Sequence, residues 1–284
     1  MDITRRDAIK TALAGAAAMG LGSLVSAVEN VPSNPPQPTN KFRPLAIAHR
    51  GYSIKYPENT LLSFSKAMEH NPDSLECDIY ITADGKPVIS HDHTTNRMGD
   101  REGVISQMAW SELKKVDVGS KKDPKFAGER IPLFEELLDL AKGKVNLCVE
   151  IKNFSATAET VRLIQEHQMI DQVVIFAFGD LAIPEVKALC PEMACLSLQA
   201  YNEERDTQIN PKVLTRRVLG LGANSIGLAN DNVTPETLKY YHQHHLFVTA
   251  WTINYDVRMR ELRDMGCDAI ISDDIVTLQQ VLNS

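Results

Sequence analysis

The sequence predicts an α/β fold of the (β/α)8 TIM-barrel class, with an extra β-hairpin and an insertion after the second strand. The chain has 284 residues, and barrels of this class commonly use about 250 residues for a single domain. Short apolar runs alternate with helical patterns at a regular interval, which is typical of βα units and a parallel sheet. One further apolar run can only be a hairpin strand, and setting it aside leaves eight parallel strands.

Residues 1–27 are predicted to be an export signal (twin-arginine-like) and not part of the barrel. Basic residues precede an Ala/Gly/Leu-rich run that ends in the small-residue triplet Val25-Ser26-Ala27, the pattern of a cleavable signal peptide. The stretch Thr4–Lys10 resembles a twin-arginine signal, although Ala8 replaces the usual large apolar residue, so a general secretory route stays open. We expect an exported protein, periplasmic or secreted. Because no cysteine precedes Cys77, the usual lipoprotein anchor has no residue to use, and we expect no stable membrane anchor.

Residues 28–44 are predicted to be a flexible Pro-rich linker, and residues 45–284 the barrel domain. The linker is rich in Pro, Asn, Ser and Thr and lacks periodicity. In the domain, eight apolar runs are predicted as parallel strands: Leu45–His49, Ser74–Tyr80, Val145–Ile151, Gln172–Phe178, Ala194–Leu198, Asn224–Leu228, Leu246–Thr252 and Asp268–Ile271. Helical patterns, several with Thr, Ser or Pro start signals, predict helices at Thr60–His70, Leu133–Ala141, Ala158–Gln168, Ile183–Leu189, Pro211–Leu219, Pro235–His245 and Val257–Met265.

The additional run, Pro87–Ser90, follows Ile81 after only five residues, far too few for a parallel crossover. It is therefore predicted to form a hairpin strand, with Asp84-Gly85 as the turn. We expect an insertion in the second βα unit, from about Ile81 to Arg130.

Polar residues gather at the carboxyl ends of the predicted strands, where barrel enzymes place their chemistry. Side chains alternate faces along a strand, so Glu76 and Asp78 point the same way, and Glu150 can converge with them from a neighbouring strand. Buried acids need a partner, and a cation would serve. This oxygen-rich set favours one divalent cation, Ca²⁺ or Mg²⁺, over Zn²⁺. The scattered cysteines match no zinc motif.

Two histidines, His49 and His91, end predicted strands near these acids, and two imidazoles can move protons near neutral pH. Most of the other histidines lie near helix ends and need no function. Arg50 and Lys152 are candidates to bind a phosphate. With the three acids and a divalent cation they leave one net positive charge, which one phosphodiester would neutralise.

Further residues are predicted to support or border this site. Glu58 could orient Arg50 or His49, and Asp92 directly follows His91. Asn59 has two interpretations, a helix cap or a support residue. Trp251, at another strand end, either bounds the pocket or packs under a loop.

The net charge limits the classes of partner that we expect, and the cysteine content bears on possible disulfides. The formal net charge is −7, and removing residues 1–27 makes it −8 because they hold three basic and two acidic residues. An acidic surface argues against nucleic acid as a standing partner. Buried free thiols are the simpler interpretation of the five cysteines, with a Cys190–Cys195 disulfide as the alternative. The sequence predicts no oligomeric state.

Together these motifs resemble the glycerophosphodiester phosphodiesterase family, over nearly everything from Leu45 to the C-terminus. The matching motifs are His49-Arg50-Gly51, Pro57-Glu58-Asn59-Thr60, Glu76-x-Asp78, His91-Asp92-x-Thr94 with Arg97, Glu150-x-Lys152 and Trp251-Thr252-x-Asn254. The resemblance implies a barrel with an insertion. It also implies that His49 and His91 are the acid/base pair, that Arg50 and Lys152 bind phosphate, and that Glu76, Asp78 and Glu150 hold the metal. Met98-Gly99-Asp100 departs from the family pattern.

The implied activity is metal-dependent hydrolysis of a small-molecule glycerophosphodiester to glycerol phosphate and an alcohol. Two alternatives remain open at this point. One is a phospholipase-like barrel that acts on lysophospholipids or phosphoinositides, which would need an apolar mouth. The other is a non-catalytic barrel that binds a phosphodiester or a sugar.

Overall fold

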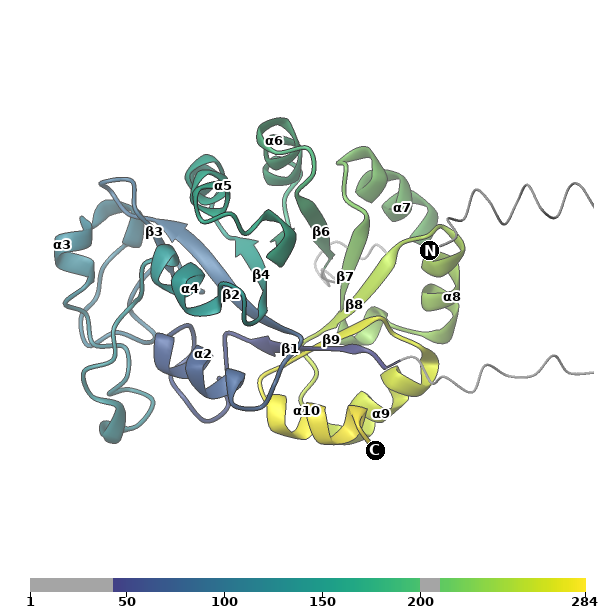
Figure 1. Ribbon diagram of the computed structural model, residues 1–284, viewed down its shortest axis with the longest axis horizontal. Helices are drawn as coiled ribbons and strands as arrows, with labels where there is room; N and C mark the ends of the chain where they lie inside the picture. The colour runs from purple at the N-terminus through teal and green to yellow at the C-terminus, as the bar shows by residue number, and fades with distance from the viewer. Residues whose placement is uncertain (1–42, 200–209) are drawn as a thin grey trace, which may run out of the picture. The chain divides into compact units, whose positions relative to one another are not determined.

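A computed structural model describes residues 43–199 and 210–284. Its central feature is a closed parallel barrel, in the strand order β1-β9-β8-β7-β6-β5-β4-β2, and pairing of β1 with β2 completes the ring (Figure 1). The eight strands of the ring are β1 (Leu45–His49), β2 (Ser74–Ile81), β4 (Asn146–Ile151), β5 (Val173–Ala177), β6 (Ala194–Gln199), β7 (Ser225–Ala229), β8 (Phe247–Trp251) and β9 (Ala269–Ser272). The predicted fold class is confirmed, and each predicted strand lies within two residues of an observed one.

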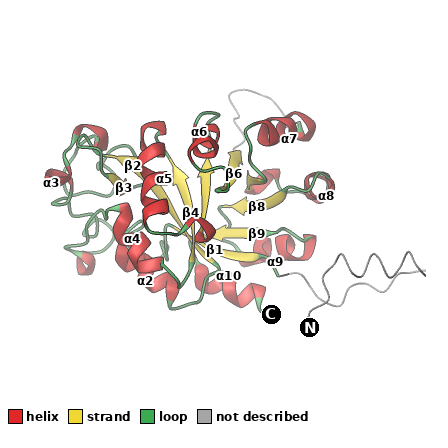
Figure 2. Ribbon diagram, turned by 45° about the horizontal axis from the view of Figure 1, so that its top comes forward, coloured by secondary structure: helices red, strands yellow, loops and turns green. Residues whose placement is uncertain are grey.

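Helices surround the strands on the outside (Figure 2). They are α2 (Leu61–Met68), α4 (Phe134–Ala141), α5 (Thr157–Glu166), α6 (Ala182–Leu189), α7 (Pro211–Gly220), α8 (Pro235–Gln243), α9 (Asp256–Met265) and α10 (Ile275–Leu282). Local start signals fix several of them. The Thr60 hydroxyl accepts the backbone N–H of Ser63 and caps α2, while α7 and α8 begin with proline, whose fixed φ suits the first helical position.

Helix α10 was not predicted from the sequence. It begins after Asp274, whose carboxylate accepts the N–H of Thr277. It buries Ile275, Leu278 and Val281, at the spacing of an amphipathic helix. The helix closes the last βα unit, so each strand of the ring leads into a helix.

The two faces of the strands have different surroundings. One face packs against the helices in the main apolar core. The other face points into the barrel, where its apolar members are Ile47, Cys148, Phe176, Leu196, Leu198, Ala269 and Ile271. His49, Glu76 and Glu150 have the same parity as these inward residues and lie nearer the carboxyl ends of their strands. The alternation therefore directs them into the mouth of the barrel.

The insertion lies between β2 and α4 and carries its own small core. Strand β3 (Pro87–Ile89) pairs antiparallel with the end of β2, which confirms the hairpin. Beyond it come the short helix α3 (Trp110–Leu113) and the 3-10 turns η1 (Ile105–Gln107) and η2 (Pro124–Phe126), at one side of the barrel (Figure 1). Its apolar residues include Val88, Ile105, Leu113, Val116, Val118 and Ile131. The predicted limits, Ile81 to Arg130, agree with this segment.

All five cysteines are buried free thiols, so the alternative Cys190–Cys195 disulfide is not formed. Across residues 43–199 and 210–284, no helix has the length and apolar character needed to span a bilayer. The predicted signal and most of the predicted linker lie outside the described residues.

Candidate active site

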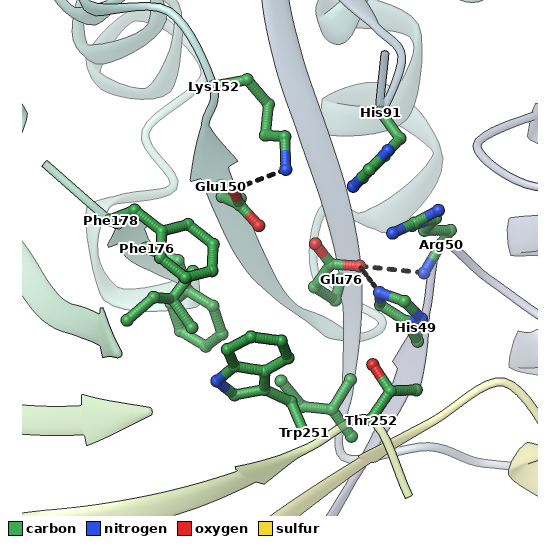
Figure 3. Close-up of a pocket in the computed structure, with 12 residues that line it drawn as sticks. His49, Arg50, Glu76, His91, Glu150, Lys152, Phe176, Phe178, Trp251 and Thr252 are labelled. Atoms are coloured by element: carbon green, nitrogen blue, oxygen red, sulfur yellow. Dashed lines mark hydrogen bonds and ion pairs between the residues drawn. The ribbon is translucent and has the colours of Figure 1, made fainter. Parts of the chain in front are cut away.

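A cavity that is partly open to solvent lies at the carboxyl ends of the barrel strands. One side is polar and the other apolar (Figure 3). The polar side contains six of the predicted site residues: His49, Arg50, Glu76, His91, Glu150 and Lys152. The apolar side contains Phe176, Phe178, Leu198, Trp251 and Ile271. The barrel thus brings residues from seven of its strands, and one from the hairpin, to one place.

Three carboxylates converge at the polar side. Glu76, Asp78 and Glu150, the carboxylate triad, place ligand oxygens within 4.8 Å of one another, and their exposed fractions are only 2%, 0% and 8%. Burial and the neighbouring negative charges raise the pKa of Glu76 well above its usual value and that of Glu150 to about 7. The triad therefore holds more negative charge than its surroundings balance.

Two cations partly offset this charge. Arg50 Nε lies 3.3 Å from Asp78 Oδ2, and Lys152 Nζ lies 2.8 Å from Glu150 Oε1 and 3.6 Å from Asp78 Oδ1. Although burial alone would raise the pKa of Asp78, Arg50 and Lys152 lower it. Asp78 lies beneath these cations and does not itself border the cavity.

The backbone turn after β1 sets the direction of Arg50. Its φ is 55°, and its N–H donates to Glu76 Oε2 at 3.0 Å. Gly51 follows with φ 82°, and a Cβ there would lie 2.5 Å from the Ser63 hydroxyl oxygen and 2.6 Å from the Ser63 carbonyl carbon. Only glycine fits this contact between the turn and α2.

Each of the two site histidines is held by a carboxylate. His49 Nδ1 lies 2.6 Å from Asp273 Oδ1, and His91 Nδ1 lies 2.7 Å from Asp92 Oδ1. Because each carboxylate accepts a hydrogen bond from Nδ1–H, Nε2 is the nitrogen left for a substrate. His49 Nε2 is 3.9 Å from Glu76 Oε2. The site thus has two oriented imidazole rings beside a buried cluster of carboxylates.

A model of the glycerophosphoryl diester phosphodiesterase family matches residues 49–277, most of the chain. The chain belongs to this family. Membership places it among the phosphoric diester hydrolases.

Similar proteins agree with this assignment. A glycerophosphodiester phosphodiesterase of Caldanaerobacter subterraneus subsp. tengcongensis is 31% identical over 243 residues, covering 84% of this chain and 97% of its own. The structure of an Oleispira antarctica phosphodiesterase in complex with the product sn-glycerol-3-phosphate is 28% identical, with a TM-score of 0.79, and covers 86% of this chain and 98% of its own. A structure from Silicibacter pomeroyi, at 24% identity, TM-score 0.77 and coverage of 85% and 93%, shows the same fold.

The predicted support residues all lie beside this candidate site. Glu58 accepts from Arg50 Nη1 at 2.9 Å. Asn59 donates its side-chain N–H to Asp78 Oδ2 at 2.8 Å, while Thr60 is the helix cap. Asp92 holds His91. Of the two interpretations of Asn59, contact with the site is the observed one.

Two further residues have clear contacts in the candidate site: Asp273, which the sequence did not single out, and Phe178, whose place at a strand end allowed the same two interpretations as that of Trp251. Asp273 holds His49 from just beyond β9 and is also bonded by Ser53 Oγ and Asn254 Nδ2. Its place two residues after the last predicted strand was the available signal. Phe178 borders the cavity and meets Trp251 edge-on, with ring centroids 5.5 Å apart. Trp251 lines the pocket, as the first of its two interpretations has it.

Proposed function

We propose that this protein hydrolyses glycerophosphodiesters to glycerol phosphate and an alcohol, by acid/base catalysis with His49 and His91 and with one divalent cation. The observation that carries the proposal is the pair of carboxylate-held histidines on one cavity with the carboxylate triad. The family assignment and the relative solved with sn-glycerol-3-phosphate support the substrate class.

The donor set suits a hard divalent cation. The triad offers only oxygen ligands, which favour Ca²⁺ or Mg²⁺ over Zn²⁺. Asp78 Oδ1 is buried without a hydrogen-bond partner, with Lys152 Nζ 3.6 Å away, so this oxygen keeps lone pairs for a bound cation. When bound at Glu76, Asp78 and Glu150, the cation supplies positive charge to the phosphate oxygens.

The side chains of the site divide the remaining work. Arg50 and Lys152 attract and orient the phosphodiester through its nonbridging oxygens. One imidazole Nε2 takes the proton of the attacking hydroxyl or water, and the other gives a proton to the departing alkoxide. Asp92 and Asp273 hold the two rings in the orientation that this exchange requires. The apolar side formed by Phe178 and Trp251 bounds the organic part of the substrate.

Product analysis tests this assignment. The purified protein should release glycerol phosphate from glycerophosphoethanolamine and glycerophosphocholine, measured by enzymatic assay of glycerol phosphate. Faster turnover of a lysophospholipid or a phosphoinositide, supplied in place of the glycerophosphodiester, would favour the lysophospholipid or phosphoinositide alternative. Binding of glycerophosphoethanolamine without turnover under any metal would favour the non-catalytic alternative.

The place of action is a further part of this proposal. The signal pattern in residues 1–27 supports export to the periplasm or the medium, with the Pro-rich segment 28–44 as a linker to the barrel domain. Expression in a bacterial host with fractionation and N-terminal sequencing tests it. A mature N-terminus near residue 28 in the exported fraction is expected, whereas a full-length cytoplasmic product would contradict the proposal.

A further inference from the structure

Arg97, in the insertion, forms hydrogen bonds with two carboxylates from different parts of the fold, those of Asp92 and Glu58. Its Nε and Nη2 lie 2.7 and 3.3 Å from Asp92 Oδ2 and Oδ1. Its Nη1 and Nη2 lie 3.0 and 2.7 Å from Glu58 Oε2 and Oε1. Both carboxylates are therefore bound in the bidentate manner that the planar guanidinium allows.

The two oxygens that Arg97 Nη2 contacts are the same ones that hold side chains of the site. Asp92 Oδ1 binds His91 Nδ1 at 2.7 Å, and Glu58 Oε1 binds Arg50 Nη1 at 2.9 Å. One nitrogen atom thus lies between the support of a histidine and the support of the phosphate-binding arginine. A shift of Arg97 would release both supports together.

The surroundings indicate that this contact is well formed. Although burial raises the pKa of Asp92, hydrogen bonds from Arg97 and His91 lower it to about 2. Hydrogen bonding from Arg97 likewise lowers the pKa of Glu58 against the effect of burial. Isolated exposed ion pairs contribute little, but bidentate pairs within a network are the exception. The Arg97 side chain is 46% exposed, so a small cation from solution can reach its position.

We propose that Arg97 is a positioning residue. By binding Asp92 and Glu58 together, it fixes the position of His91, which transfers a proton, relative to Arg50, which binds the phosphate. The inference rests on the proposed function. It gives the insertion a definite part in the reaction, because Arg97 is 39 residues from Glu58 in the chain and ties the insertion to the turn after β1.

A comparison of three variants separates this role from a general structural one. Asp92→Asn should mainly lower kcat because it affects His91, and Glu58→Gln should mainly raise KM because it affects Arg50. Arg97→Gln should do both, with a loss in kcat/KM of about 10- to 100-fold, the range for residues that orient catalytic groups. Arg101→Gln is the matched control, since Arg101 lies in the same segment and forms an ion pair with exposed Asp100 at 3.5 Å. It should stay within about twofold of the wild type.

Two further variants keep the test independent of folding defects. Arg97→Lys retains the charge but cannot make paired contacts with two carboxylates, so it should fold and show the same two changes. Arg97→Ala should regain several-fold in kcat/KM with guanidinium at tens of millimolar, but not with sodium at equal ionic strength. In the Arg97→Ala/Glu58→Gln double variant, guanidinium should not improve phosphate affinity, measured as KM.

Wild-type kinetics in Arg97→Lys would overturn the proposal, because charge alone would then suffice. A loss in Arg97→Gln that follows only its folded fraction, measured by circular dichroism, would overturn it as well. If the wild type fails to hydrolyse glycerophosphoethanolamine, the proposed function fails. The role of Arg97 is then tested separately, by calorimetric measurement of the affinity of each variant for inorganic phosphate. Weaker phosphate binding in Arg97→Gln and Glu58→Gln, with Arg101→Gln unchanged, supports the coupling; equal binding in all of them contradicts it.

Discussion

Replacing Asp273 by asparagine tests whether His49 takes part in proton transfer. Asp273 Oδ1 lies 2.6 Å from His49 Nδ1. Although burial alone raises the pKa of Asp273, the hydrogen bond and charge of His49 lower it to about 2. The carboxylate is therefore ionised at neutral pH and favours the ring orientation that leaves Nε2 for the substrate. Asparagine keeps the size of the side chain and removes the charge.

The size of the effect follows from this one contact. A hydrogen bond to a charged group contributes about 1.5–3 kcal/mol. About 1.4 kcal/mol changes a rate tenfold. If the whole of this free energy stabilises the transition state, Asp273→Asn should lower kcat by roughly 10- to 150-fold. The change in KM should be much smaller.

The assay is steady-state release of glycerol phosphate from glycerophosphoethanolamine, with thermal unfolding measured alongside. Asp268→Asn is the matched control, because Asp268 Oδ2 lies 2.8 Å from His242 Nε2 just before β9, at the opposite end of the barrel. The control can lower stability but should leave the kcat of the folded protein within about twofold. Equal kcat values for the wild type and Asp273→Asn would refute the role assigned to His49.

Three other variants have definite expected outcomes. His91→Ala should lose about 10²- to 10⁴-fold in kcat, the range for acid/base groups, with unchanged circular dichroism; a loss under tenfold would remove His91 from the mechanism. Gly51→Ala should lower the free energy of unfolding by about 1–3 kcal/mol, since its Cβ would meet Ser63 at 2.5 Å and its φ is 82°; urea denaturation measures this. Asp117 accepts four hydrogen bonds in the insertion, from the N–H groups of Gly119, Ser120 and Gly128 and from Ser120 Oγ, and these lower its pKa despite burial. A lowered folded-state pKa gives stability that is present above the unfolded pKa of about 3.9 and is lost as the pH falls through the folded value. Asp117→Asn should therefore cost about 2 kcal/mol at pH 7, a difference that shrinks below about pH 4; a cost independent of pH would contradict this.

The barrel could be predicted because its strands are buried on both faces and read as short apolar runs separated by helical patterns. The residues of the site could be located for a related reason. Side-chain alternation places Glu76 and Asp78 on one face, and the carboxyl ends of all parallel strands meet at one rim. Local sequence therefore determined both the fold and the residues at its mouth.

The supporting contacts could not be predicted in the same way, because they join distant parts of the chain. Asp273 reaches His49 across 224 residues, and Arg97 reaches Glu58 across 39. Neither pair has a local signature, and the direction of an arginine side chain in an irregular segment depends on the folded insertion. The C-terminal helix is a different case, since the apolar spacing from Ile275 to Leu282 was visible in the sequence.

Metal dependence is the most direct test of the account as a whole. Protein treated with chelator should lose hydrolysis of glycerophosphoethanolamine, and Ca²⁺ or Mg²⁺ should restore it better than Zn²⁺. Glu150→Gln, which removes one charge from the carboxylate triad, should need a higher concentration of the same ion. Full activity in the presence of chelator, or an unchanged ion requirement in Glu150→Gln, would contradict the assignment of Glu76, Asp78 and Glu150 as the metal site.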